Sequence, residues 1–247
     1  MKVVVCVKMI KATLLNSDAV GLALNPYDLF ALRQCEKLKE TNDIELYAIC
    51  MGPKSGTDII QRIYAMGADK VVLISDSVYA GSDTVATSCI LYHALKQIDN
   101  INLICCGQKA VDGETGQVPY GIAERLGVNF IDGVKNIEMR DNNLIISRNN
   151  EKESQLLVSK LPLMVIFDDF MTDSSVSLLK LKKSKSMTVE IWNNDVLKCN
   201  EEHCGESGSK TKVLSVRNSY TKKSSCMIGG DSFDQARQII SIINGGM

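Results

Sequence analysis

A loop of glycine, carboxylate, amide and hydroxyl residues carries the clearest chemical signal in this sequence. It spans residues 107–118, follows the apolar run 101–106, and precedes a predicted helix at 119–127. This order is typical of phosphate binding in parallel α/β proteins, because glycine permits close backbone approach and helix N-terminal amides attract anions. An ordinary strand-to-helix connection is the alternative. The candidate ligand-binding residues are Gly107, Gln108, Ala110, Val111, Asp112, Gly113, Thr115, Gly116, Gln117 and Val118.

Four shorter segments join this loop as candidates. Three lie at or near the ends of predicted strands, and the fourth begins a predicted helix. In a parallel sheet, all of them would gather at one edge and form a cleft. Their candidate residues are Cys6, Val7 and Lys8, then Asn25, Tyr27 and Asp28, then Met51 and Gly52, and finally Gly81, Asp83, Thr84 and Thr87.

Several familiar catalytic and metal-binding patterns do not occur. No Gly-x-Gly-x-x-Gly follows the first predicted strand, and no phosphate loop ends in Gly-Lys-Ser/Thr. The two histidines, His93 and His203, form no nucleophile–base–acid set, so we assign no catalytic residue. Cys199 and Cys204 flank His203, but this spacing lacks the fourth ligand of a zinc site, so we predict no metal.

Composition narrows the possible environments. The chain has 247 residues and a net charge of −1, which does not favour a nucleic acid or a membrane surface as partner. Its apolar runs are strand-sized, too short to span a bilayer, and residues 3–7 do not form a signal peptide. Nine cysteines without a disulfide framework fit a reducing cytoplasm.

The first half of the chain alternates predicted strands and helices. Continuous apolar strands near residues 3–7, 44–51, 70–75 and 101–106 are typical of a parallel sheet covered on both faces. Helices are predicted between them, at residues 27–39, 56–66 and 83–98. This rhythm predicts a doubly wound, mostly parallel α/β fold. The family resemblance described below implies that it is of the adenine-nucleotide-binding type, similar to flavodoxin and universal stress proteins.

The second half adds different elements. Short strands joined by polar turns are predicted at residues 134–140, 143–147 and 155–159, and a buried strand at 163–169. Residues 178–185 are basic and irregular. The polar residues 193–230 predict an extended arm that needs a partner surface, followed by a helix at 231–243. We therefore expect a nucleotide-binding domain at 1–192 and a C-terminal arm with a helix at 193–247.

The order and spacing of these motifs resemble the β subunit of electron-transfer flavoproteins along nearly the whole chain. The matching segments include 3–8, 24–28, 51–53, 65–69, 107–118 and 160–162, and then 208–213. The resemblance implies a heterodimer with an α subunit that carries FAD, with residues 193–247 packed on that subunit. It also implies a nucleotide in the cleft, either a structural AMP or, in the electron-bifurcating branch, a second FAD that takes hydride from NADH.

The segment from Gly81 to Ser88 resembles the bifurcating branch, in which electrons also reach ferredoxin or flavodoxin. It reads Gly-Ser-Asp-Thr-Val-Ala-Thr-Ser, and Asp83 and Thr84 are expected to hold the ribityl or diphosphate part of FAD. This favours FAD over AMP. The sequence departs from the family pattern in two places. Residues 9–14 replace the usual loop after Lys8, which weakens the expectation that NADH docks there. Lys210 stands where relatives carry proline, which alters the motif at 208–211.

The basic segment has two possible interpretations. By composition it is a solvated surface. By resemblance it is the loop that docks an acyl-CoA dehydrogenase, with an apolar anchor surrounded by lysines; the expected contact residues are Leu178, Lys180, Lys182 and Lys183. A standalone nucleotide-binding regulator of the universal stress type is a further alternative, but the arm and this basic segment argue against it.

Overall fold

The computed structural model describes residues 1–16, 18–150, 153–212, 215 and 227–244. The chain divides into two compact units, Met1–Lys212 and Val213–Met247. The first unit contains the sheet and all the candidate site residues. In the second unit, helix α8 (Ser232–Ile243) begins at Asp231, whose carboxylate accepts the N–H groups of Phe233 and Asp234. The helix predicted at 231–243 is therefore confirmed.

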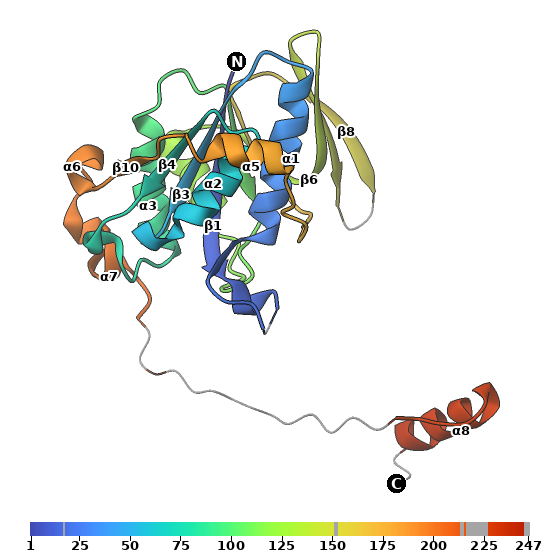
Figure 1. Ribbon diagram of the computed structural model, residues 1–247. Coiled ribbons are helices and arrows are strands. Elements are labelled where there is room, and N and C mark those ends of the chain that lie inside the picture. Colours follow the sequence, from blue (N-terminus) through green and yellow to red (C-terminus); the bar gives the residue numbers. More distant parts are fainter. Residues whose placement is uncertain (17, 151–152, 213–214, 216–226, 245–247) are drawn as a thin grey trace. The chain divides into compact units, whose positions relative to one another are not determined.

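A ten-stranded mixed sheet forms the first unit (Figure 1), with the strand order β10-β4-β3-β1-β5-β9-β6-β7-β8 and β2 paired to β1. The strands from β10 to β6 run parallel. The predicted α/β fold class is confirmed. The parallel strands are β1 (Lys2–Lys11), β3 (Glu45–Met51), β4 (Lys70–Ile74), β5 (Leu103–Gly107), β6 (Phe130–Arg140), β9 (Leu163–Phe167) and β10 (Glu190–Trp192).

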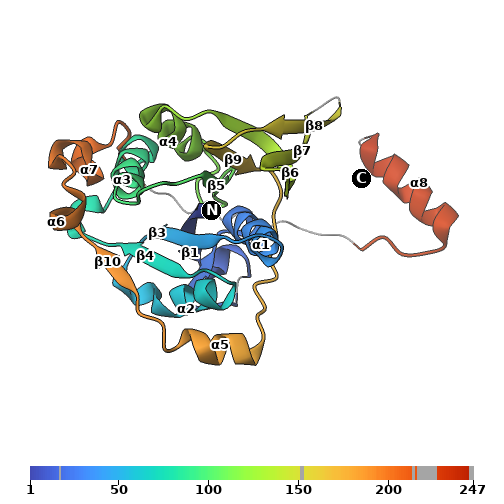
Figure 2. The same cartoon turned by 90° about the horizontal axis from the view of Figure 1, so that it is seen from above.

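Helices cover both faces of this sheet (Figure 2). One face packs against α1 (Pro26–Glu40) and α2 (Thr57–Ala65), and the other against α3 (Thr84–Lys96) and α4 (Val118–Leu126). Every residue of β5 and β9 is buried. Continuous apolar strands therefore form here because neither face meets water.

The sheet ends in an antiparallel extension. β7 (Asn143–Asn149) pairs with β6 and with β8 (Ser154–Ser159), as the polar turns predict. β8 is the edge strand. Its alternation of exposed and half-buried residues leaves Leu156 exposed. The short strands β2 (Leu22–Leu24) and β10 were not predicted from the sequence.

Residues 178–185 are not irregular, because α5 (Leu178–Ser184) is a helix packed against α2. The Ser177 hydroxyl accepts the N–H group of Lys180 and caps this helix, with a 3.2 Å separation. Leucine and lysine are good helix formers, and the charges of lysines in the last turn interact favourably with the helix dipole. The run of lysines obscured the helical pattern, so the sequence alone did not predict this helix.

Residues 193–212 belong to the first unit rather than to an extended arm, so the unit boundary follows Lys212 and not residue 192. This segment contains α6 (Asn194–Leu197) and α7 (Gly205–Gly208). Three of its four apolar residues, Leu197, Cys199 and Cys204, are buried in the core beneath α3, whereas Val196 is exposed. Their wide spacing in a polar stretch gave no periodic signal. Residues 213–214 and 216–226 of the predicted arm lie outside the described residues.

Candidate functional site

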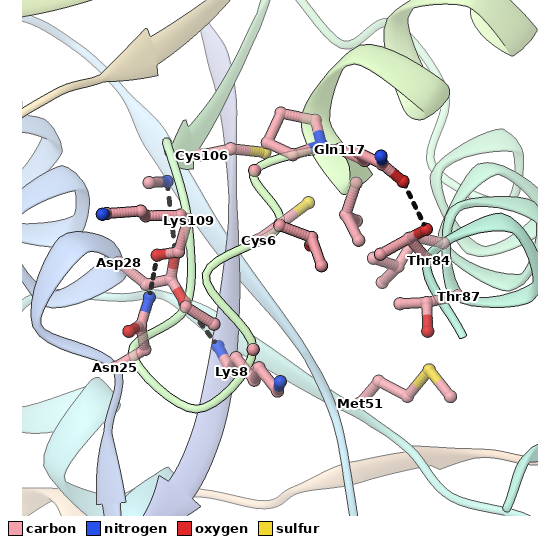
Figure 3. A pocket seen from close by; sticks show the side chains of 18 of the residues that line it. Cys6, Lys8, Asn25, Asp28, Met51, Thr84, Thr87, Cys106, Lys109 and Gln117 are labelled. Carbon is pink, nitrogen blue, oxygen red and sulfur yellow. Dashed lines mark hydrogen bonds between the residues drawn. The ribbon is translucent and has the colours of Figure 1, made fainter. Parts of the chain in front are cut away.

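A cleft of about 400 Å³ opens at the carboxyl ends of β1, β3 and β5 (Figure 3). The loop between β5 and α4 forms one wall, and the start of α3 forms the opposite wall. Most of the predicted ligand-binding residues line this cleft: Cys6, Val7, Lys8, Asn25, Asp28, Met51, Gly81, Asp83, Thr84, Thr87, Gly107, Gln108, Ala110, Asp112, Gly113, Thr115, Gly116, Gln117 and Val118. The parallel strand order brings these separate segments together.

Three predicted residues do not line the cleft. The Tyr27 ring lies under the Lys109 ammonium group, 5.7 Å from it, and packs against the Phe170 ring at an angle of 49°. Gly52 donates its N–H group to the Ile74 carbonyl, which fixes the turn after β3. Val111 donates its N–H group to the Asn25 side chain. All three support the cleft from behind.

Sequence reasoning missed other residues of the cleft. Leu91 and Ile122 follow the helix periodicity of α3 and α4, so their burial was predictable but their contact with the cleft was not. Tyr79 carries no local signal. Its ring is buried, and its hydroxyl donates to the Asn194 side chain, 3.1 Å away. The missed lining residues are Tyr79, Ser82, Leu91, Cys106, Lys109, Glu114, Pro119 and Ile122.

Asn25 and Asp28 anchor the loop instead of facing the cleft with free polar groups. Asn25 is fully buried, its amide nitrogen donates to the Lys109 carbonyl at 2.8 Å, and its oxygen accepts from Val111. The Asp28 carboxylate accepts the N–H groups of Lys8 and Gly107 at 2.9 and 3.2 Å. These bonds join α1, β1 and β5 at the base of the loop.

The environment of Asp28 predicts a pH-dependent stability. Burial raises its pKa to about 7, against the opposing effect of the hydrogen bonds from Asn25, Lys8 and Gly107. The folded chain therefore holds this proton more tightly than the unfolded chain. Between pH 5 and pH 8, the free energy of unfolding should fall by about 2–3 kcal/mol through this group alone, and level off above pH 8.

Denaturant titrations of the wild type and of Asp28→Asn between pH 5 and pH 9 test this prediction. The variant has no titratable group at position 28. The difference between the two curves of unfolding free energy against pH therefore gives the contribution of the Asp28 carboxyl group. Parallel curves for the two proteins would contradict a raised pKa.

The two helix starts at the cleft differ in what their amides bind. At α3, the Asp83 carboxylate accepts the N–H groups of Val85 and Ala86 at 2.9 and 3.0 Å. At α4, no side chain of the described residues caps the helix, and Pro119 occupies its first turn. Within the described residues, no hydrogen bond takes the N–H groups of Thr115, Gly116 or Gln117. The α4 start is therefore the place where the cleft offers donors to a phosphate.

Asp83 has little capacity left for a ligand. Its second oxygen accepts the N–H groups of Lys210 and Thr211 at 2.7 and 3.0 Å. Burial acts to raise the pKa of Asp83, but hydrogen bonds from the α3 and 210–211 amides outweigh it and hold the pKa below its usual value. Asp83 is thus a fixed anion that joins two segments of the cleft wall.

Polar contacts cross the mouth of the cleft and basic groups surround it. Thr84 donates its hydroxyl to the Gln117 side chain at 2.9 Å, which links the starts of α3 and α4 (Figure 3). Lys8 forms an ion pair with Asp112 at 2.7 Å. Both partners are partly exposed, so this pair contributes little to stability and can rearrange around a ligand.

The floor of the cleft is apolar. Cys6 and Cys106 are aligned on β1 and β5, with Leu91 and Ile122 beside them. A hydrogen bond with Cys6 and burial raise the pKa of Cys106, so this thiol is neutral. Such a floor suits a flat, weakly polar ring system. No group of His, Cys, Asp or Glu residues suited to a metal ion occurs among the described residues, and Cys199 and Cys204 contact each other without His203.

A second surface of interest lies on α5. Leu178 is 83% exposed, next to Leu179, which is 81% exposed. Lys180 forms an ion pair with Glu36 of α1 at 2.9 Å, whereas no ion pair involves Lys182 or Lys183 in the described part of the chain. Two exposed leucines with free lysines beside them are unusual for a surface that contacts only water.

Comparison with known proteins shows which family the chain resembles. Residues 13–197 match the model of the electron transfer flavoprotein domain. The caffeyl-CoA reductase-Etf complex subunit CarD of Acetobacterium woodii is 28% identical over 95% of this chain and 94% of its own length. Protein FixA of Bradyrhizobium diazoefficiens is 31% identical over 81% of this chain and 72% of its own. The electron transfer flavoprotein subunit beta of Clostridium acetobutylicum is 29% identical over 86% of each. No helix in the described ranges has the length and apolar character needed to cross a membrane.

Proposed function

This chain belongs to the electron transfer flavoprotein family, and from that premise we propose that it is a β-type subunit that binds FAD in its cleft. It would pair with an α-type subunit in the cytoplasm and take electrons from NADH. The observation that carries the proposal is the glycine-rich loop with unpaired amides above an apolar floor. The names of the relatives, which include an Etf complex subunit and a subunit beta, support the same assignment.

The residues present fit an adenine dinucleotide. Cys6, Cys106 and Ile122 form a flat apolar surface that suits an adenine ring, and the amides of Thr115, Gly116 and Gln117 suit a phosphate. The cleft continues to Thr84 and Thr87 on α3, whose hydroxyls suit a second phosphate or a ribityl chain. FAD bound here would supply hydride acceptance and one-electron transfer. The protein's own groups hold the cofactor and exclude water.

The choice between FAD and AMP rests on the α3 side of the cleft. AMP would need only the floor and the α4 start. Gly81, Ser82, Asp83, Thr84 and Thr87 line the cleft as well, and the segment that they belong to resembles the bifurcating pattern. We therefore favour FAD, with ferredoxin or flavodoxin as one electron acceptor. A carrier with structural AMP is the second candidate, favoured by the altered segment 9–14 after Lys8.

The α5 surface supports an acyl-CoA dehydrogenase as the second electron acceptor. Leu178 offers an apolar anchor, while Lys182 and Lys183 offer charges that speed encounter with an acidic partner. Lys180 is held by Glu36, so it would position α5 more than it would contact the partner.

A count of cofactors tests the proposal. The αβ complex is purified, extracted with acid, and its nucleotides are separated by chromatography. We expect two FAD per complex, one from each subunit. One FAD with one AMP would replace the FAD assignment by the AMP alternative. One FAD with no second nucleotide would contradict the assignment of the cleft itself.

A further inference from the structure

Two loops far apart in the sequence are joined at the α3 wall of the cleft. We call residues 79–83 the wall and residues 205–211 the strap. The Ser209 hydroxyl accepts the N–H group of Asp83 at 2.8 Å and lies 2.9 Å from the Gly81 carbonyl. The Gly205 N–H group donates to the Ser82 hydroxyl at 3.1 Å. The strap therefore binds the wall through its backbone and through one serine.

Asp83 connects this junction to the helix that borders the cleft. One of its oxygens caps α3, and the other accepts the N–H groups of Lys210 and Thr211 and the Thr211 hydroxyl. If the strap left the wall, these strap donors would be released to water, the Asp83 carboxylate would lose three hydrogen bonds, and the Asp83 N–H group would lose its bond to Ser209. The start of α3, including Thr84 at the mouth, would then be held less firmly.

The strap fits the wall closely. Gly205 has a φ of +57°, and a Cβ atom there would lie 2.9 Å from the Ala80 carbonyl oxygen of the wall and 2.1 Å from the carbonyl oxygen of Val78, just before the wall. Ser209 is only 8% exposed, yet it does not line the cleft. The chain reaches the end of the first unit at Lys212, directly after the strap. The strap is thus both the back of the cleft wall and the last segment before the second unit.

We propose that Asp83 is a positioning residue that couples the strap to cofactor binding: release of the strap weakens nucleotide binding, and bound nucleotide holds the strap on the wall. This inference rests on the proposed nucleotide in the cleft. By linkage, the factor by which strap release weakens nucleotide binding equals the factor by which nucleotide opposes strap release. Any partner that pulls on residues after Lys212 would then change the lifetime of the bound cofactor.

Ser209→Ala in the αβ complex tests the coupling, because this change breaks the junction without touching the cleft surface. We expect the nucleotide of the β-type subunit to dissociate about tenfold faster than in the wild type. The absorbance or fluorescence of the nucleotide after dilution of the complex measures this rate. Trypsin cleavage after Lys210, followed by mass spectrometry, should accelerate by a similar factor. Added nucleotide should slow that cleavage. Ser159→Ala on the edge strand β8, a half-buried serine whose hydroxyl donates to the Lys160 carbonyl, serves as the matched control.

The outcomes separate the coupling from the proposed function. Faster cleavage with unchanged nucleotide release would make the strap merely structural and overturn the coupling. Unchanged cleavage and release would also overturn it. If Ser209→Ala does not fold, Thr211→Val removes one strap hydrogen bond and should show both effects in weaker form. A wild-type complex without nucleotide in this subunit would overturn the proposed function, and the coupling with it.

Discussion

Replacement of Gly107 by alanine should remove nucleotide from the cleft. Gly107 ends β5 where the loop meets the start of α1. A Cβ atom there would lie 2.5 Å from an Asp28 carboxylate oxygen and 2.6 Å from the Tyr27 backbone carbon. Backbone cannot move aside cheaply, so the loop base would separate from α1 and the two Asp28 hydrogen bonds would be strained.

The expected effects of Gly107→Ala are large. Nucleotide affinity should fall at least a hundredfold, because the loop amides lose their alignment. The free energy of unfolding should fall by about 2–4 kcal/mol, in the range of overpacked core positions and broken buried hydrogen bonds. Cofactor content of the purified complex and denaturant titration measure the two quantities.

Gly113→Ala is the matched control within the same loop. A Cβ atom at Gly113 meets nothing within 4 Å, and its φ is not in the left-handed region. Gly113 lines the cleft, but the added methyl group leaves the loop backbone undisturbed, so this variant should keep its stability and lose far less cofactor than Gly107→Ala. Equal cofactor loss in both variants would contradict the role of the Gly107 junction and point to general sensitivity of the loop.

Replacement of Leu178 by alanine should impair electron transfer to the proposed dehydrogenase partner without affecting the proposed cofactor. The side chain is 83% exposed and leaves the core unchanged when it is truncated. A buried apolar anchor of an interface typically contributes 2 kcal/mol or more, so the apparent affinity for the partner should fall about thirtyfold. Steady-state reduction of the dehydrogenase at varied partner concentration measures this change, while flavin content and unfolding serve as references.

Leu156→Ala on the edge strand β8 is the control, because this leucine is 70% exposed in a different part of the fold. It should leave dehydrogenase reduction unchanged. If Leu178→Ala reduced the dehydrogenase with wild-type kinetics, the proposed contact would be contradicted and α5 would be an ordinary solvated helix. The dependence of the reduction rate on salt concentration adds a further check. Salt screens the lysine charges, so the encounter of the two proteins should slow as ionic strength rises.

The sequence predicted the parts of this fold that hydrophobic burial dictates. Strands such as β1 and β5 are apolar throughout because both faces are covered, and α1 begins at Asn25-Pro26 as the proline position indicates. The cleft followed from topology, since the carboxyl ends of parallel strands meet at one edge. These predictions depend on local pattern and on a general rule of strand order.

The sequence did not reveal the contacts that join distant segments. Ser209 reaches Asp83 across more than a hundred residues, and neither residue is unusual in its own neighbourhood. Asp83 was expected to hold a ligand, whereas its oxygens bind α3 and the strap. Helix α5 was concealed by its own lysines. Such features depend on tertiary contacts, which a single sequence does not display.

The unpaired amides at the start of α4 have a consequence for the supply of folded protein. Groups that lack partners among the described residues would gain them when the proposed nucleotide arrives, so the ligand would add directly to the folding equilibrium. A nucleotide at one hundred times its dissociation constant would raise the free energy of unfolding by about 2.7 kcal/mol. Cells short of this cofactor would hold less of the folded subunit, so its abundance would follow nucleotide metabolism without any change in gene expression.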